Sequence, residues 1–387
     1  MTRRGRFALL FGVAAYLAAW AFGSKALYPL AVGLVVAPLA AWAWMRLARR
    51  PVSLTRVTRG RDHFEGDDVE VEVRVELGPG IPPAAVVLQE SISKLGERTT
   101  RLRGGEAQYV LARLPRGRYE VVRAAAVLED PFGLARTEVE LSAHSPVLVY
   151  PRLVRLQQLF TEVGSTLSEG KRVLVHRPSG FDLHSVREHQ QGESLRRVHW
   201  RSTAKRGRLM VRELEDAPRD EVAVLLDAQA AAGQTFDTVV RAAGSLLLAH
   251  TSRNRRAVLV VNGRAVESVQ AGASEGDRRR VLEVLAAAEP DGGRPPDVLL
   301  SDGGSPVLHA LELVVVTAGL TPRLVERLIQ RGHARRHVSL VYVDGRHDPE
   351  PGLLRLRAAG IPVAVVRPGD DLAPALGGRV LAEAAGG

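Results

Sequence analysis

The chain has 387 residues and a mass of 41.9 kDa, which is enough for two or three domains. Its composition, 45% hydrophobic and 25% charged, is typical of folded globular domains and excludes a disordered or fibrous chain. The absence of cysteine excludes disulfides, cysteine-ligated zinc, iron–sulfur clusters and thiol nucleophiles.

The net charge of +10 comes from two basic stretches. Residues 1–50 carry seven Lys or Arg and no acid, and residues 171–213 carry eleven against four acids, so the rest of the chain sums to −4. The first stretch flanks apolar segments and indicates membrane topology. Only the second is therefore a candidate surface for a charged ligand.

Two uncharged stretches, residues 7–24 and 26–45, stand near the start of the chain. At about 1.5 Å per residue they reach roughly 27 and 30 Å, close to the thickness of a bilayer hydrocarbon core. Arginines precede the first stretch and follow the second, so the positive-inside rule predicts a transmembrane hairpin (1–50) in the cell (inner) membrane with both termini cytoplasmic. A cleavable signal peptide and a pair of buried core helices are the alternatives.

An all-β sandwich is predicted for residues 51–150. Residues 69–77 alternate strictly between apolar and charged side chains, as in a half-buried antiparallel strand. Further strand-like runs at 85–92, 107–114, 118–128 and 136–149 are separated by turns that contain glycine or proline. We expect a spacer or adhesion module without chemistry of its own.

The next segment, residues 151–218, contains the second basic stretch. Ser194 can cap a helix that runs to about Arg206, with Gly207 ending it. In such a helix Arg196 and Trp200 lie one turn apart and can form a cation–π contact.

Residues 219–387 alternate between apolar runs and helical patterns, which predicts an α/β domain. The expected strands are 221–227, 256–261, 313–317, 338–343 and 361–366, and the expected helices are 235–251, 275–288, 321–333, 350–359 and 372–384. Continuous Val and Leu runs favour a parallel sheet covered on both faces. Ligands of such sheets bind beyond the carboxyl ends of the strands, where Asp227 and Thr317 stand.

Several motifs resemble those of the domain-of-unknown-function 58 family. They are Pro115-Arg-Gly-Arg-Tyr119, Asp130-Pro-Phe-Gly-Leu134, Tyr150-Pro151, Arg187, His189, Gly192-Glu193, Arg196, Trp200 and Ala204-Lys205. The family usually has Tyr at the position of His189, Gly-Asp at that of Gly192-Glu193 and Ala-Arg at that of Ala204-Lys205. The resemblance covers most of the chain and implies a membrane-anchored bacterial protein whose C-terminal half is similar to a von Willebrand factor A domain, a Rossmann-like fold. It also implies genes for MoxR-type AAA+ ATPases and transglutaminase-like membrane proteins as neighbours, but no activity.

Relatives with the A domain bind Mg²⁺ through Asp-x-Ser-x-Ser together with a Thr and a second Asp. This chain keeps Asp227 but has Gln229 and Ala231 at the serine positions and Ala318 where the second Asp is expected. One carboxylate is a poor octahedral site, so we predict no metal. The sequence also lacks the glycine-rich phosphate-binding motifs, and no cofactor is expected.

Two roles are assigned within the basic stretch. Arg187, Glu193, Arg196 and Trp200 are expected to form an internal ion network, because buried arginine needs a partner. The remaining cations, Arg201, Lys205, Arg206 and Arg208, are expected to bind a partner protein or anionic lipid headgroups.

The leading hypothesis for function is a non-enzymatic membrane-anchored scaffold or adaptor that docks a partner protein. The partner expected first is a MoxR-type AAA+ ATPase, with a transglutaminase-like membrane protein as a further possibility. The alternative is a hydrolase-like enzyme that uses polar residues of segment 176–201, although the segment shows no recognisable nucleophile and base pair. Nucleic-acid binding through residues 171–213 is disfavoured, since the rest of the chain sums to −4 and this stretch has a single tryptophan for stacking on bases.

Overall fold

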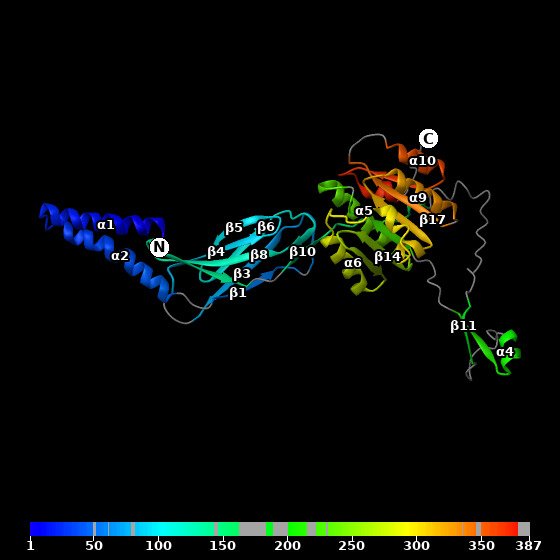
Figure 1. The fold of residues 1–387 in the computed structure, drawn as a ribbon, viewed down its shortest axis with the longest axis horizontal. Coiled ribbons are helices and arrows are strands. Elements are labelled where there is room, and N and C mark those ends of the chain that lie inside the picture. Colours follow the sequence, from blue (N-terminus) through cyan, green and yellow to red (C-terminus); the bar gives the residue numbers. More distant parts are fainter. Residues whose placement is uncertain are drawn as a thin grey trace, which may run out of the picture. The chain divides into compact units, whose positions relative to one another are not determined.

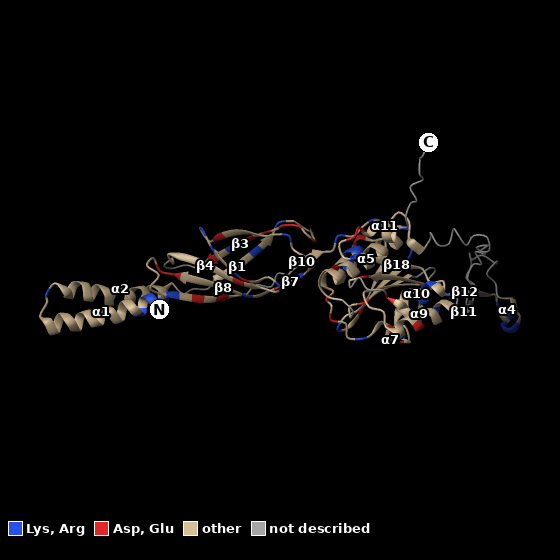
Figure 2. Cartoon of the chain, turned by 90° about the horizontal axis from the view of Figure 1, so that it is seen from above, with Lys and Arg blue, Asp and Glu red and all other residues tan. Residues whose placement is uncertain are grey.

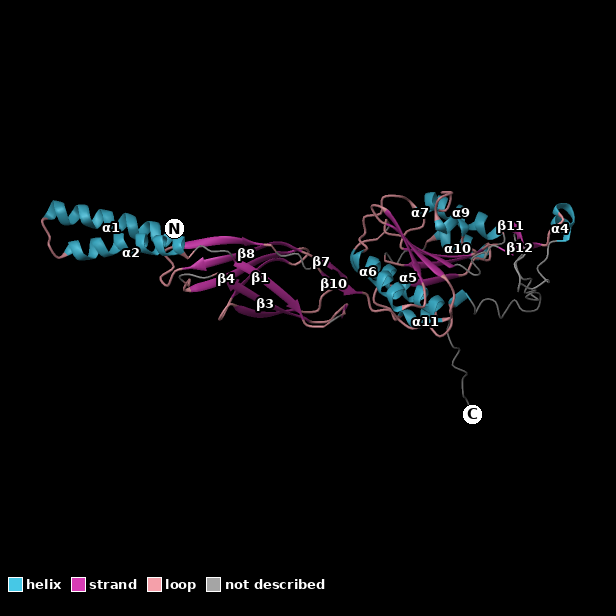
Figure 3. Ribbon diagram, turned by 90° about the horizontal axis from the view of Figure 1, so that it is seen from below, coloured by secondary structure: helices cyan, strands magenta, loops and turns pink. Residues whose placement is uncertain are grey.

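The computed structural model describes residues 1–48, 52–60, 62–78, 82–142, 146–161, 183–188, 200–214, 222–229, 231–334, 336–345 and 350–377. Contacts along the chain define two compact units, Met1–Tyr150 and Pro151–Gly387 (Figure 1). The first unit holds a helical hairpin and β-sheets, and the second holds an α/β domain (Figure 3).

The first unit begins with two long helices, α1 (Arg3–Phe22) and α2 (Leu27–Leu47). Thr2 caps α1, and a left-handed Gly23 with φ of 65° ends it. Buried positions in α1 recur every seven residues, at Gly5, Gly12 and Ala19, which places small side chains on one face as close helix packing requires. Both helices are long and apolar enough to cross a membrane. This confirms the expected pair of apolar helices, and the orientation of the termini stays a prediction.

The β-sheets of this unit form a sandwich. One sheet has the order β1-β3-β6, a second β5-β4-β8-β9, and a small third β2-β10-β7. The strands are β1 (Val52–Thr58), β2 (His63–Phe64), β3 (Val69–Leu77), β4 (Ala85–Ile92), β5 (Gly96–Arg101), β6 (Glu106–Leu111), β7 (Gly117–Tyr119), β8 (Val121–Glu129), β9 (Arg136–Leu141) and β10 (Val147–Tyr150). Alternate valines of β3, from Val69 to Val75, share a core with Leu88 and Ala126 of the second sheet. The alternation at 69–77 therefore predicted this strand correctly.

An ion network lies inside the sandwich. Arg56 forms an ion pair with Glu90, and their side chains are only 5% and 1% exposed. The hydroxyl of Tyr109 donates to Glu90 Oε2 over 2.7 Å. Burial, and then the negative charge of Glu90, raise the pKa of Tyr109 well above its ordinary value. Arg56 and Tyr109 therefore stabilise the buried negative charge of Glu90, which would be costly without partners.

The α/β domain of the second unit has one six-stranded sheet in the order β15-β14-β13-β16-β17-β18. Its strands are β13 (Val222–Leu226), β14 (Ala257–Asn262), β15 (Val266–Ala271), β16 (Glu312–Thr317), β17 (His337–Val343) and β18 (Val363–Val366). All neighbours are parallel except β15, which pairs antiparallel with β14. The five expected strands are present, and β15 is an additional edge strand. Its mostly exposed side chains lack the apolar run that marks the others.

Helices cover both faces of this sheet. One face packs on α5 (Gly233–Ser252), α6 (Glu275–Ala287) and α11 (Leu372–Leu376), and the other on α7 (Pro296–Leu299), α8 (Pro306–His309), α9 (Pro322–His333) and α10 (Pro351–Ala358). In β13, Val224 belongs to the first core and Leu225 to the second. Because successive side chains point to opposite faces, this double burial explains the unbroken apolar run.

The basic segment contributes a small sheet and a helix. Strand β11 (Leu183–Glu188) pairs antiparallel with β12 (Met210–Leu214), and α4 (Trp200–Arg206) lies between them in the sequence. Gly207, with φ of 64°, donates its N–H to Thr203 O over 2.9 Å and ends α4 as expected. The expected helix start at Ser194 lies outside the described residues.

Candidate functional site

Asp227 lies at the carboxyl end of the central strand β13, and it is 2% exposed. Its Oδ1 accepts the Gln229 backbone N–H over 3.0 Å and the Asn262 Nδ2 over 2.9 Å. Its Oδ2 accepts the Thr317 hydroxyl over 2.6 Å. The ends of three neighbouring strands, β14, β13 and β16, thus converge on one carboxylate.

Asn262 connects this carboxylate to two further loops. Its Nδ2 also donates to Arg294 O over 3.0 Å, and its Oδ1 accepts the backbone N–H of Ala228. The sequence pattern indicates Asp227 and Thr317 at this edge, but Asn262 was not predicted. The signal was available, since Asn262 is the polar residue that directly follows the apolar run of β14.

The segment Gly292-Gly293 packs against the loops at the carboxyl ends of β13 and β14. Gly292 donates its N–H to Ala228 O over 3.1 Å, and Gly293 donates to Gly263 O over 3.0 Å. A Cβ added at Gly292 would lie 2.7 Å from the backbone nitrogen of Gln229, so a side chain cannot fit there. This segment therefore packs its main chain against the loops that follow β13 and β14.

These residues do not fit a hard cation. Two N–H groups donate to Asp227, one from the backbone of Gln229 and one from the side-chain amide of Asn262. Both would point the partial positive charge of their hydrogens at a metal ion bound to this carboxylate. Ala231 and Ala318 are half-buried and pack against the core. The described part of the chain therefore offers a single, already hydrogen-bonded carboxylate where Mg²⁺ needs six oxygen ligands.

The second candidate site is the surface of α4. Arg201, Lys205, Arg206 and Arg208 are exposed, and Trp200 at the helix start is 67% exposed. In Figure 2 part of the α4 ribbon is blue, the colour of Lys and Arg. The structure therefore places the four cations assigned to partner binding on one short segment.

The four residues assigned to an internal network are only partly described. Glu193 and Arg196 lie outside the described residues, and for Arg187 the structure gives only its place in β11, opposite Val211 of β12. Trp200 is exposed where it begins α4. The network stays a prediction.

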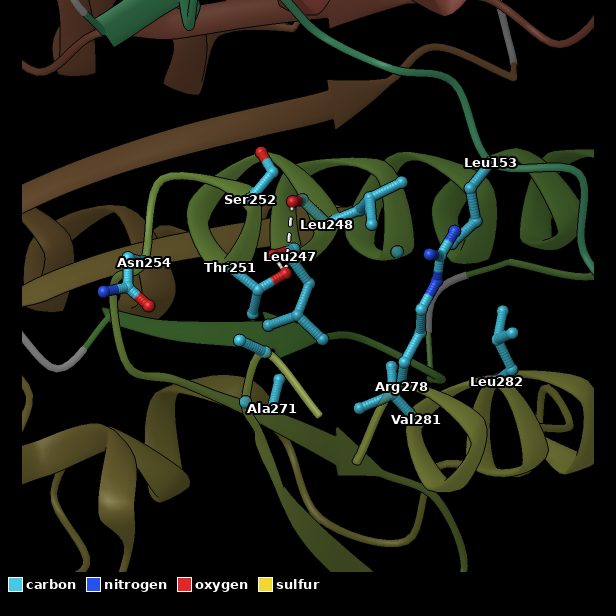
Figure 4. A pocket seen from close by; sticks show the side chains of 13 residues that line it. Leu153, Leu247, Leu248, Thr251, Ser252, Asn254, Ala271, Arg278, Val281 and Leu282 are labelled. Atoms are coloured by element: carbon cyan, nitrogen blue, oxygen red, sulfur yellow. Dashed lines mark hydrogen bonds between the residues drawn. The ribbon is translucent and has the colours of Figure 1, made fainter. Parts of the chain in front are cut away.

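A cavity of about 290 Å³ lies between α5 and α6 (Figure 4). Leu153, Leu247 and Val281 contribute apolar walls, and Arg278 is the one charged residue among those that line it. The Thr251 hydroxyl at its edge donates to Leu247 O over 3.1 Å, within its own helix. The lining combines no acid with a base, so the cavity offers no catalytic pair.

Two comparisons place the chain among known sequences. A family model described as "Protein of unknown function DUF58" matches residues 185–364, which include most of β11, all of α4 and most of the α/β sheet. The "Uncharacterized protein YeaD" of Bacillus subtilis (strain 168) is 25% identical over 294 residues, which cover 71% of this chain and 73% of YeaD. These matches support a similarity to the family over residues 185–364. They do not identify the C-terminal half as a von Willebrand factor A domain.

Solved structures give only distant similarity. Fibronectin(III)-like modules of Clostridium thermocellum CbhA are 20% identical, with 27% of this chain and 99% of that chain covered and a TM-score of 0.18. Cwp6 from Clostridium difficile is 7% identical, with 81% of this chain and 45% of Cwp6 covered and a TM-score of 0.17. TM-scores this low carry no argument about fold or function.

Proposed function

We propose that this protein is a non-enzymatic, membrane-anchored scaffold whose α4 surface docks a partner protein, a MoxR-type AAA+ ATPase, at the cytoplasmic face of the membrane. The observation that carries the proposal is the exposed surface of α4. Arg201, Lys205 and Arg206 extend from a seven-residue helix that begins with the exposed Trp200. Residues 200–212 include no acidic residue, so this stretch of sequence has a net positive charge.

The chemistry of this surface favours an acidic protein partner. Clustered cations steer a negatively charged surface into contact, and an exposed tryptophan supplies the apolar anchor typical of interface hot spots. Leu209, 42% exposed, adds apolar area beside the same helix. The class of the partner rests on the gene neighbours that the family resemblance implies.

Two features of the α/β domain support a docking role without chemistry. The strand order with one antiparallel edge strand suits a domain similar to the von Willebrand factor A type, and we propose that identity for residues 219–387. At the edge where such sheets bind ligands, Asp227, Asn262 and Thr317 satisfy one another. They present no paired nucleophile and base to a substrate.

Binding of the purified ATPase to the full chain in nanodiscs of uncharged lipid tests this proposal. The double variant Arg201→Glu/Lys205→Glu reverses two cations four residues apart on α4, and Arg323→Glu/Arg327→Glu makes the same charge change at the same spacing on α9. We expect the first variant to weaken binding tenfold or more and the second to leave it within twofold. Equal effects of the two variants would contradict the proposal, since long-range charge alone would then account for binding.

A further inference from the structure

The start of α1 is joined to a turn of the β-sandwich, residues 130–134. The Thr2 backbone N–H donates to Leu134 O over 3.0 Å, and the Thr2 hydroxyl donates to Gly133 O over 2.8 Å. A Cβ added at Gly5 would lie 2.1 Å from Leu134 O. The first turn of α1 can therefore approach this turn closely only because residue 5 is glycine.

The end of α2 packs beside the same turn. Ala41 and Met45 share a buried cluster with Leu128 and Ala135, which flank the turn in β8 and just before β9. The Trp44 indole N–H donates to Pro82 O over 3.3 Å. Both helices of the hairpin thus hold one end of the sandwich.

The turn itself is internally fixed, yet it carries an exposed aromatic ring. Asp130 is 5% exposed, and its carboxylate accepts the backbone N–H groups of Phe132 over 2.9 Å and Ala135 over 2.5 Å. Gly133 adopts the left-handed φ of 67° that completes the turn. The Phe132 side chain is 76% exposed, although apolar rings of this size normally pack in a core.

The place of the turn along α1 sets its depth relative to a membrane. From Thr2 to Phe7, the first apolar residue after the arginines of α1, five residues rise about 7.5 Å. The headgroup layer between hydrocarbon and water is roughly 5–8 Å thick on each side. A turn hydrogen-bonded to Thr2 therefore lies within the headgroup layer when α1 crosses the bilayer.

We propose that Phe132 is a membrane-surface anchor, which inserts at the boundary between lipid headgroups and acyl chains and fixes the β-sandwich against the bilayer. The lipid is the occupant because the turn is hydrogen-bonded to the first turn of a spanning helix, and exposed Phe side chains, like Trp and Leu, bury at the boundary between headgroups and acyl chains in membrane-surface segments. The Asp130–Leu134 motif then has a physical role: Asp130 holds the turn, Gly133 and Leu134 bind α1, and Phe132 meets the lipid. This inference rests on the membrane anchorage contained in the proposed function.

The absence of cysteine permits a direct test with single labelling sites. The full chain carrying Phe132→Cys is labelled with an environment-sensitive nitrobenzoxadiazole dye and reconstituted into phosphatidylcholine vesicles that contain a doxyl-lipid quencher. Val122→Cys is the matched control, because Val122 is 73% exposed and belongs to β8, the strand that leads into the turn. Val122 lies seven residues before Glu129, roughly 23 Å along the strand from the turn. Val36→Cys, in the middle of α2 and 54% exposed, reports whether the hairpin is inserted.

We expect quenching at least fivefold stronger for the label at position 132 than at position 122, together with strong quenching at position 36. Quenching at 36 with equally weak signals at 132 and 122 would overturn the anchor while leaving the membrane hairpin intact. Absence of quenching at 36 would overturn the membrane anchorage itself, and the anchor with it. The three labels therefore separate failure of this inference from failure of the proposed function.

Discussion

Replacing Thr317 by valine removes one hydroxyl from the network around Asp227 and leaves the shape of the side chain nearly unchanged. Thr317 is fully buried, and its hydroxyl both donates to Asp227 Oδ2 and accepts the Gly319 N–H over 3.0 Å. In the variant, one carboxylate oxygen and one backbone donor lose their partner inside the domain. A hydrogen bond to a charged group contributes about 1.5–3 kcal/mol, so we expect a loss of about 2–3 kcal/mol of unfolding free energy.

Hydrogen–deuterium exchange of the full chain measures this loss within the α/β domain alone. Since about 1.4 kcal/mol corresponds to a factor of ten, amides of β13 and β16 should exchange roughly 30- to 150-fold faster when exchange reports opening of the domain. Thr251→Val is the matched control. The Thr251 hydroxyl donates to the neutral carbonyls of Leu247 and Leu248 in its own helix, each over 3.1 Å. That change should cost about 1 kcal/mol or less. Equal acceleration in both variants would refute the network as a specific stabiliser of the sheet edge.

Three further predictions concern the metal, the sandwich core and the topology. Millimolar Mg²⁺ or Mn²⁺ should leave the exchange of β13 unchanged, because a ligand stabilises only a native state that binds it; slower exchange that Asp227→Ala abolishes would show a functional metal site. Arg56→Met should destabilise the β-sandwich by about 3–5 kcal/mol, since it leaves Glu90 buried without its cation, as judged by exchange of β4. Arg59→Met breaks only exposed pairs with Glu70 and Glu72 and should cost less than about 1 kcal/mol; a reversed order would mean that the buried pair does not stabilise the sandwich. A reporter fused after Gly387 should be active as a cytoplasmic fusion and inactive as alkaline phosphatase, and the opposite pattern would reverse the orientation.

The sequence predicted those strands in which burial of one or both faces determines which positions are apolar. Strand β3 alternates because one face of its sheet is buried, and β13 is uniformly apolar because both faces are. Strand β15 was not predicted from the sequence, because its exposed side chains show neither pattern. Strand β5, whose residues are largely polar, was not predicted for the same reason.

The candidate site was less predictable, since its contacts join distant parts of the chain. Asp227 and Asn262 are 35 positions apart, and Asp227 and Thr317 are 90 apart. A local pattern places each residue at a strand end but does not show which of them meet. The approach of Gly292 to Gln229 depends on the path of a loop, which no periodicity encodes.

Photocrosslinking in native membranes tests whether the α4 surface docks an AAA+ ATPase. Ala204 is an exposed position of α4, so Ala204→Cys, the only cysteine of the chain, can carry a benzophenone without removing a cation. Arg327→Cys, exposed on α9, is the reference site. We expect crosslinked peptides of a MoxR-type ATPase from position 204 and not from position 327. Crosslinks from position 204 that contain only lipid or another class of protein, or equal capture of the ATPase at both positions, would contradict this expectation.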